Sequence, residues 1–146
     1  MRGLGVGLAA VLPIVLGCAT TSALAPGTPA PPPLAASTGR TTGDGVFTSA
    51  QAGDGDRLFR GSCQGCHEPR EFSGIRFTIR WSGQSLGELF DVVSTTMPQG
   101  SPGSLEAGEY AALAAYLLEL NGYPAGETPL PGEAARLRGI TIVDPE

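Results

Sequence analysis

Two cysteines and one histidine, Cys63, Cys66 and His67, form the pattern with the clearest chemistry in this chain. Cys-x-x-Cys-His is the pattern that attaches a c-type haem. Two thiols can bond to the two vinyl groups of one porphyrin, and an imidazole can bind its iron. Residues at i, i+3 and i+4 share one face of a helix. One turn can therefore present both sulfurs and an axial nitrogen to a flat ligand, and we predict one covalently bound haem c here.

Three other uses of the same residues were weighed against haem. A thioredoxin-like redox site requires a βαβ context, and no strand pattern flanks the motif. A structural zinc site requires four Cys or His ligands, whereas the chain has three Cys and one His, and Cys18 lies far upstream in different sequence. A disulfide between Cys63 and Cys66 is the third alternative. Haem is favoured, and the other three stay open.

Met97 is the candidate for the second axial ligand. It is the only methionine after the initiator, His67 is the only histidine, and all nine basic residues are Arg rather than Lys. A lone Met usually fills a core, but with haem granted it is the one strong side-chain ligand available, and Pro98 stiffens its loop. His/Met ligation is typical of electron transfer and raises the reduction potential. Iron with both axial positions filled has no vacant site for a substrate.

The N-terminus resembles an export signal. Residues 1–17 contain Arg2 and an apolar run at 4–16 that is too short to span a bilayer. Val15-Leu16-Gly17-Cys18 is similar to the lipidation signal of bacterial lipoproteins, and lipidation of Cys18 would explain the odd cysteine. Cleavage after Ala23-Leu24-Ala25 and an uncleaved anchor are the alternatives. We expect an exported protein on the periplasmic side, held at the membrane by a lipid.

Composition and charge bound the rest of the chain. Residues 18–46 are rich in Pro, Ala, Thr and Gly, which is typical of a disordered tether. The net charge is −5, and no basic domain is present, so nucleic-acid binding is excluded as a function. Arginines flank the motif and acidic residues dominate after Trp81, and such asymmetry can steer encounter with a partner.

Three principal helices are predicted in the folded region, residues 47–124. The first begins at Thr48, with Gln51 completing a capping box, and leads into the motif. The second covers Ser85–Thr95, where Ser85 and Glu88 form a capping box, and the third covers Ser104–Leu120 with Ser104 as its N-cap.

Two further segments are less regular. Residues 68–83 alternate as a strand would, but no partner strand exists, so a loop with short helical turns is expected. The C-terminal extension, 125–146, contains a short helix at 133–138 and a β-like end at 140–143, which we expect to be packed or frayed.

With these residues placed, the chain resembles a class I monohaem cytochrome c, a bacterial periplasmic type associated with quinoprotein or other dehydrogenases. The likeness covers about residues 47–124, with Gly55–His67 similar to the first helix and haem motif of that family. Met97-Pro98 resembles its ligand loop. Gly55 and Phe59 match the residues that cross an aromatic of the last helix, here Tyr116. The resemblance implies an all-α cytochrome c fold, with three main helices around the haem.

The resemblance also implies a function. The protein would be a one-electron carrier, cycling Fe(III)/Fe(II), rather than an enzyme, although it could be the cytochrome subunit of a dehydrogenase. A periplasmic dehydrogenase, including the quinoprotein type, would be the donor, and an oxidase or another cytochrome the acceptor. The alternatives are a haem-based sensor or ligand-binding module with a displaceable Met97, and a peroxidase-like enzyme.

One departure from the family concerns His67. The family often has a Gly-Pro after the motif whose carbonyl accepts the hydrogen bond of the axial His, and here Glu68-Pro69-Arg70 follows instead. An acceptor is still required to orient the imidazole, and the sequence does not identify it. Arg76, Arg80 and Trp81 are candidates to contact haem propionates, with ordinary surface charge and a packing Trp as the alternative.

Overall fold

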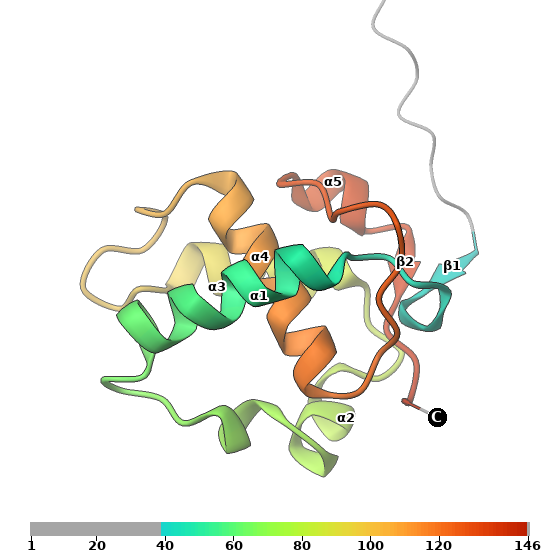
Figure 1. Cartoon of the computed structure of the whole chain (residues 1–146), viewed down its shortest axis with the longest axis horizontal. Coiled ribbons are helices and arrows are strands. Elements are labelled where there is room, and N and C mark those ends of the chain that lie inside the picture. Colours follow the sequence, from blue (N-terminus) through green and yellow to red (C-terminus); the bar gives the residue numbers. More distant parts are fainter. Residues whose placement is uncertain (1–38, 146) are drawn as a thin grey trace, which may run out of the picture. The chain divides into compact units, whose positions relative to one another are not determined.

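The computed structural model describes residues 39–145. The predicted leader, Cys18 and the tether up to residue 38 lie outside the described residues. The described part is mostly helical, as predicted (Figure 1). Its α-helices are α1 Ser49–Leu58, α2 Ile75–Trp81, α3 Leu86–Thr96, α4 Ala107–Leu120 and α5 Ala134–Leu137. The shorter elements are the 3-10 helices η1 Thr42–Asp44 and η3 Pro69–Phe72, the π-helical turn η2 Phe59–Cys63, and the strands β1 Arg40–Thr41 and β2 Ile140–Thr141.

The centre of the fold is the crossing of α1 over α4 (Figure 1). A Cβ atom added to Gly55 would collide with the Ala112 carbonyl and would lie 2.8 Å from the Tyr116 Cβ. Only glycine permits so close an approach of two backbones. Next to it, the Phe59 and Tyr116 rings pack with centroids 5.2 Å apart. The expected crossing of Gly55 and Phe59 against Tyr116 is confirmed.

The C-terminal extension belongs to the same core as the predicted helical domain. Leu130, Leu137, Ile140 and Ile142 are all buried in the cluster that contains the α4 residues. Helix α5 packs on α3 at Gly87, where an added Cβ would lie 2.7 Å from the Ala134 carbonyl oxygen. The packed structure therefore continues beyond residue 124, because side chains of the C-terminal extension are buried in the same core as those of α3 and α4.

The two ends of the described chain pair with each other. Strands β1 and β2 are parallel, with Arg40 in register with Ile140, and Val143 N–H donates to the buried Thr42 hydroxyl at 3.2 Å. Residues 40–46, which the sequence analysis assigned to the linker, are therefore part of this structure. Residues 140–143, which were expected to be packed or frayed, are packed, because Ile140 and Ile142 are buried and Ile140–Thr141 form strand β2.

The helix starts confirm some predictions and correct others. Ser85 and Glu88 form the predicted capping box of α3. Thr48 caps α1 by accepting from the Gln51 N–H at 3.2 Å, but the Gln51 side chain bonds Leu130 instead of closing the box. The predicted N-cap Ser104 is wrong, because α4 begins at Ala107.

A capping box of Glu106 and Glu109 starts α4 in place of Ser104. Between the motif and α3, residues 68–83 form η3 and α2, as the prediction of short helical turns required. No helix in the part of the chain described here is long and apolar enough to cross a membrane.

Candidate functional site

The predicted motif residues lie on a single turn that continues α1 through η2. The N–H groups of Cys66 and His67 both donate to the Cys63 carbonyl, at 3.1 and 3.0 Å. Both cysteines are free thiols, so the disulfide alternative is not formed in this structure. Cys63 is half-buried against the core and Cys66 is exposed, and burial raises the pKa of the Cys63 thiol. The structure thus brings together the three residues that the motif required.

His67 has the acceptor that the sequence did not identify. Its Nδ1 atom lies 3.2 Å from Oε2 of Glu71, and its ring meets the edge of the Phe72 ring with centroids 5.2 Å apart. The hydrogen bond with His67, followed by that with the Glu68 N–H, lowers the pKa of Glu71. The other ring nitrogen, Nε2, makes no hydrogen bond to residues 39–145.

Asn121, at the end of α4, holds the segment that follows His67. Its Nδ2 donates to the Phe72 carbonyl at 2.8 Å, and its Oδ1 accepts from the Gly74 N–H at 2.9 Å. Asn121 is a residue that the sequence did not identify as part of the site. No local signal could have shown that this amide reaches a loop 47 residues earlier in the chain.

Met97 is the C-cap of α3, with its backbone bonded on both sides. Its N–H donates to the Val93 carbonyl at 3.0 Å, and its carbonyl accepts from the hydroxyl of buried Tyr110 at 2.8 Å. Tyr110 is a second residue that the sequence did not identify as part of the site. No hydrogen bond, ion pair or aromatic contact within residues 39–145 joins Met97 to the motif.

The three candidate propionate contacts lie on α2. The Arg80 guanidinium carbon is 4.8 Å from the centroid of the Trp81 ring, and Trp81 packs against the core. Neither Arg76 nor Arg80 forms an ion pair in the described part of the chain, where the other arginines from 57 to 138 all do. Ile75 and Ile79 on this helix are 69% and 80% exposed. Helix α2 thus presents aliphatic and cationic side chains together.

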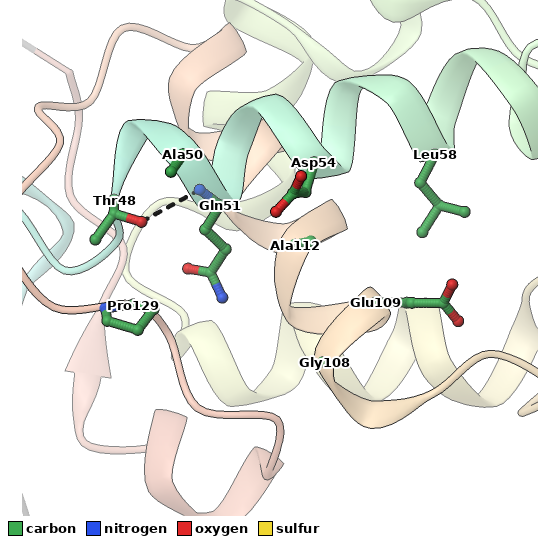
Figure 2. A pocket seen from close by; sticks show the side chains of 9 residues that line it. All are labelled: Thr48, Ala50, Gln51, Asp54, Leu58, Gly108, Glu109, Ala112 and Pro129. Atoms are coloured by element: carbon green, nitrogen blue, oxygen red, sulfur yellow. Dashed lines mark hydrogen bonds between the residues drawn. The ribbon is translucent and has the colours of Figure 1, made fainter.

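An open groove of about 550 Å³ lies elsewhere, between α1 and the first turn of α4 (Figure 2). Asp54 and Glu109 line it, together with Gln51 and Leu58, but none of the predicted site residues does. Its acid Asp54 is already paired with Arg57. Over residues 39–145, no three His, Cys, Asp or Glu side chains gather as a metal-binding group.

The chemistry of the donor set fits a covalently held haem. Two free thiols and an imidazole share one turn, and the imidazole has its Nδ1 atom engaged and its Nε2 atom available. That arrangement is the one required of an imidazole that binds a metal through Nε2. No protein-family model, no curated protein and no solved structure matches this chain.

Proposed function

We propose that this protein is a c-type cytochrome with a cytochrome c fold, which carries one electron at a time outside the cytoplasm. The observation that carries the proposal is the single turn on which Cys63, Cys66 and His67 lie, with the His67 Nδ1 atom already bonded to a carboxylate. A bound haem c would supply an iron that alternates between the ferric and ferrous states.

Each motif residue has a defined part in this proposal. Cys63 and Cys66 would form the thioethers, each thiol adding across a vinyl double bond so that one C–S and one C–H bond form without an oxidant. His67 would bind the iron through Nε2. Arg76, Arg80 and Trp81 are the candidates to contact the propionates, because both guanidinium groups lack carboxylate partners within residues 39–145.

Met97 would occupy the opposite axial position. Two backbone hydrogen bonds fix the residue, one from Tyr110 and one to Val93. A ligand on a fixed loop dissociates less readily, which favours a carrier over a sensor with a displaceable Met97. A periplasmic dehydrogenase, including the quinoprotein type, is the proposed donor, and an oxidase or another cytochrome is the proposed acceptor. The proposed location is the periplasmic side of a membrane, with Cys18 as lipid anchor.

The first test is covalent attachment. The full chain is produced with a haem c maturation system, and its intact mass is measured under denaturing conditions. We expect one haem on the wild-type chain and none on the double variant Cys63→Ala/Cys66→Ala. Cys18→Ala is the matched control, because it removes the third cysteine and should leave the haem attached. A wild-type chain without haem would refute the proposal.

The second test separates a carrier from a sensor or a peroxidase-like enzyme. Carbon monoxide binding to the reduced protein is followed at neutral pH for wild type and for Met97→Ala. We expect very little binding to the wild type and rapid binding to the variant, because only the variant has an open iron position. Equally fast binding by both proteins would contradict the carrier function and favour a ligand-binding module.

A further inference from the structure

The position of Glu71 bears on how the proposed axial histidine is controlled. Within residues 39–145, the His67 ring has one hydrogen-bond partner, the Glu71 carboxylate, at 3.2 Å from Nδ1. An imidazole that binds iron through Nε2 carries its proton on Nδ1 and donates it to a neighbour. The hydrogen-bond acceptor of this histidine is therefore an anionic carboxylate. In the family that this chain resembles, the acceptor is often the neutral backbone carbonyl of a Gly-Pro.

The Glu71 side chain is itself held in place by the turn that it starts. Pro69 opens η3, and Glu71 occupies the third position of that short helix. Its Oε1 accepts from the Glu68 N–H at 3.3 Å, so Oε2 is directed to His67. One carboxylate thus bonds the backbone on one oxygen and the imidazole on the other, which limits the rotamers open to it.

Phe72, the residue after Glu71, connects the His67–Glu71 pair to helices α1 and α4. The Phe72 ring stands between His67 and the buried Phe59, with edge-to-face contacts to both rings. The Phe72 carbonyl is bonded to Asn121 at the end of α4. The turn that carries Glu71 is therefore tied to the same α1/α4 crossing that continues into the Cys63–His67 turn.

A structural ion pair does not account for this arrangement. The two side chains are 31% and 45% exposed, and an ion pair exposed to solvent contributes little to stability. A carboxylate that accepts the second proton of a metal-bound imidazole instead makes the imidazole a stronger ligand and fixes its orientation. Hydrogen bonding at an axial ligand is one of the means by which a protein sets the reduction potential of haem.

We propose that Glu71 is the positioning residue of His67, which aims Nε2 at the iron and lowers the reduction potential by strengthening the axial ligand. The inference rests on the proposed haem function. It predicts that the increase in reduction potential caused by His/Met ligation is partly offset in this protein by the negative charge of Glu71.

The test uses the full haem-loaded chain and three variants. Glu71→Ala removes the acceptor, Glu71→Gln keeps an acceptor oxygen without the charge, and Glu68→Gln is the matched control. The control removes one charge from the same turn, where Glu68 pairs with Arg70 and not with His67. We expect Glu71→Ala to shift the ferric–ferrous equilibrium about tenfold towards the ferrous form, or about 59 mV for one electron. Glu71→Gln should shift it less, and Glu68→Gln should leave it unchanged.

A second readout isolates the hydrogen bond. His67 is the only histidine, so labelling with ¹⁵N-histidine gives NMR signals from a single ring. In the reduced protein we expect exchange of the Nδ1 proton with solvent to quicken about tenfold in Glu71→Ala, and not in Glu68→Gln. A role limited to stability would change the unfolding midpoint without moving the potential or the exchange rate.

The outcomes are distinguishable. A haem-loaded Glu71→Ala protein with the wild-type potential and exchange rate would overturn the inference and leave the proposed function standing. The same holds if Glu68→Gln shifts the potential as much as Glu71→Ala, because the effect would then be one of net charge. A chain that acquires no covalent haem overturns both.

Discussion

The α1/α4 crossing and the Cys63–His67 turn differ in how closely the rest of the chain packs against them. At the crossing, the backbone of α4 at Ala112 lies so close to α1 that Gly55 has no room for a methyl group. Around the motif turn the packing is open. A methyl group added at Gly61 or Gly65 would meet no other part of the described chain within 4 Å. Cys66 is exposed. Nearby in sequence, Ile75 and Ile79 are exposed as well.

The two regions differ in how many polar and apolar groups they leave without a partner inside the protein. Large exposed apolar side chains next to polar ones commonly mark a binding surface. The packed region has buried hydroxyl and amide groups that are all hydrogen-bonded over residues 39–145, whereas the motif region keeps free thiols and a free imidazole nitrogen at its surface. The contrast supports a bound group on the motif side.

The sharpest test of the comparison replaces glycine by alanine in each region. Gly55→Ala forces a methyl group into the Ala112 backbone, and we expect it to lower the free energy of unfolding by about 3 kcal/mol or more. Gly61→Ala has open space, and we expect a change of less than about 1 kcal/mol, in the stabilising direction. Denaturant unfolding followed by circular dichroism measures both, and equal losses would abolish the distinction.

A smaller effect is expected where the packed region holds the proposed ligand loop. Tyr110→Phe removes the hydrogen bond to the Met97 carbonyl, which should cost about 1 kcal/mol of stability. In the haem-loaded protein, the same change should quicken carbon monoxide binding to the reduced form about fivefold, as that energy implies.

Tyr123→Phe is the matched control for this prediction. Tyr123 is also buried, and its hydroxyl donates to the backbone carbonyl of Val143, far from Met97 in the chain. It should lose comparable stability without any change in carbon monoxide binding. If both variants bind carbon monoxide alike, the Tyr110 bond does not control Met97.

The smallest expected effect is a pH dependence of stability that arises at the start of α3. Hydrogen bonds from the Ser85 N–H and hydroxyl lower the pKa of Glu88 below its ordinary value of 4.5. Its contribution to stability is therefore complete above pH 4.5 and is lost as the pH falls through the lowered folded-state value. Glu88→Gln should flatten the decline of the unfolding midpoint in that acid range.

Glu119→Gln is the control for the acid range, since Glu119 is exposed on α4 and accepts no side-chain hydrogen bond within residues 39–145. Its pH profile of stability should follow that of the wild type. A Glu88→Gln profile that also matches the wild type would show that the capping box contributes nothing measurable.

Local patterns in the sequence predicted the helices well, because capping and apolar spacing act over four or five residues. Ser85 with Glu88 forms the predicted start of α3, whereas the packing role of Gly55 was implied by the family resemblance and not by a local pattern. Ser104 was predicted as the N-cap of α4, but the helix begins at Ala107, where the Glu106 N–H donates to the Glu109 carboxylate.

Contacts between distant segments could not be predicted in the same way. Gln51 was expected to cap its own helix, yet it satisfies both backbone groups of Leu130, which lies 79 positions later. The linker and the C-terminal extension were separated from the domain because neither has a long helical pattern. At the site, the motif residues were evident from spacing, while Asn121 and Tyr110 act through contacts with Phe72 and Met97, 49 and 13 positions away. Glu71 lies only four positions after His67, and its contact depends on the turn formed by η3.

The pairing of β1 with β2 has a consequence for the order in which the protein can form. The Val143 N–H donates to the Thr42 hydroxyl, 101 positions earlier in the chain, so this contact joins two segments that are far apart in sequence. Closing so long a loop is entropically costly and slow. The Cys63–His67 turn closes over only four positions, so we expect it to form before the β1–β2 contact does.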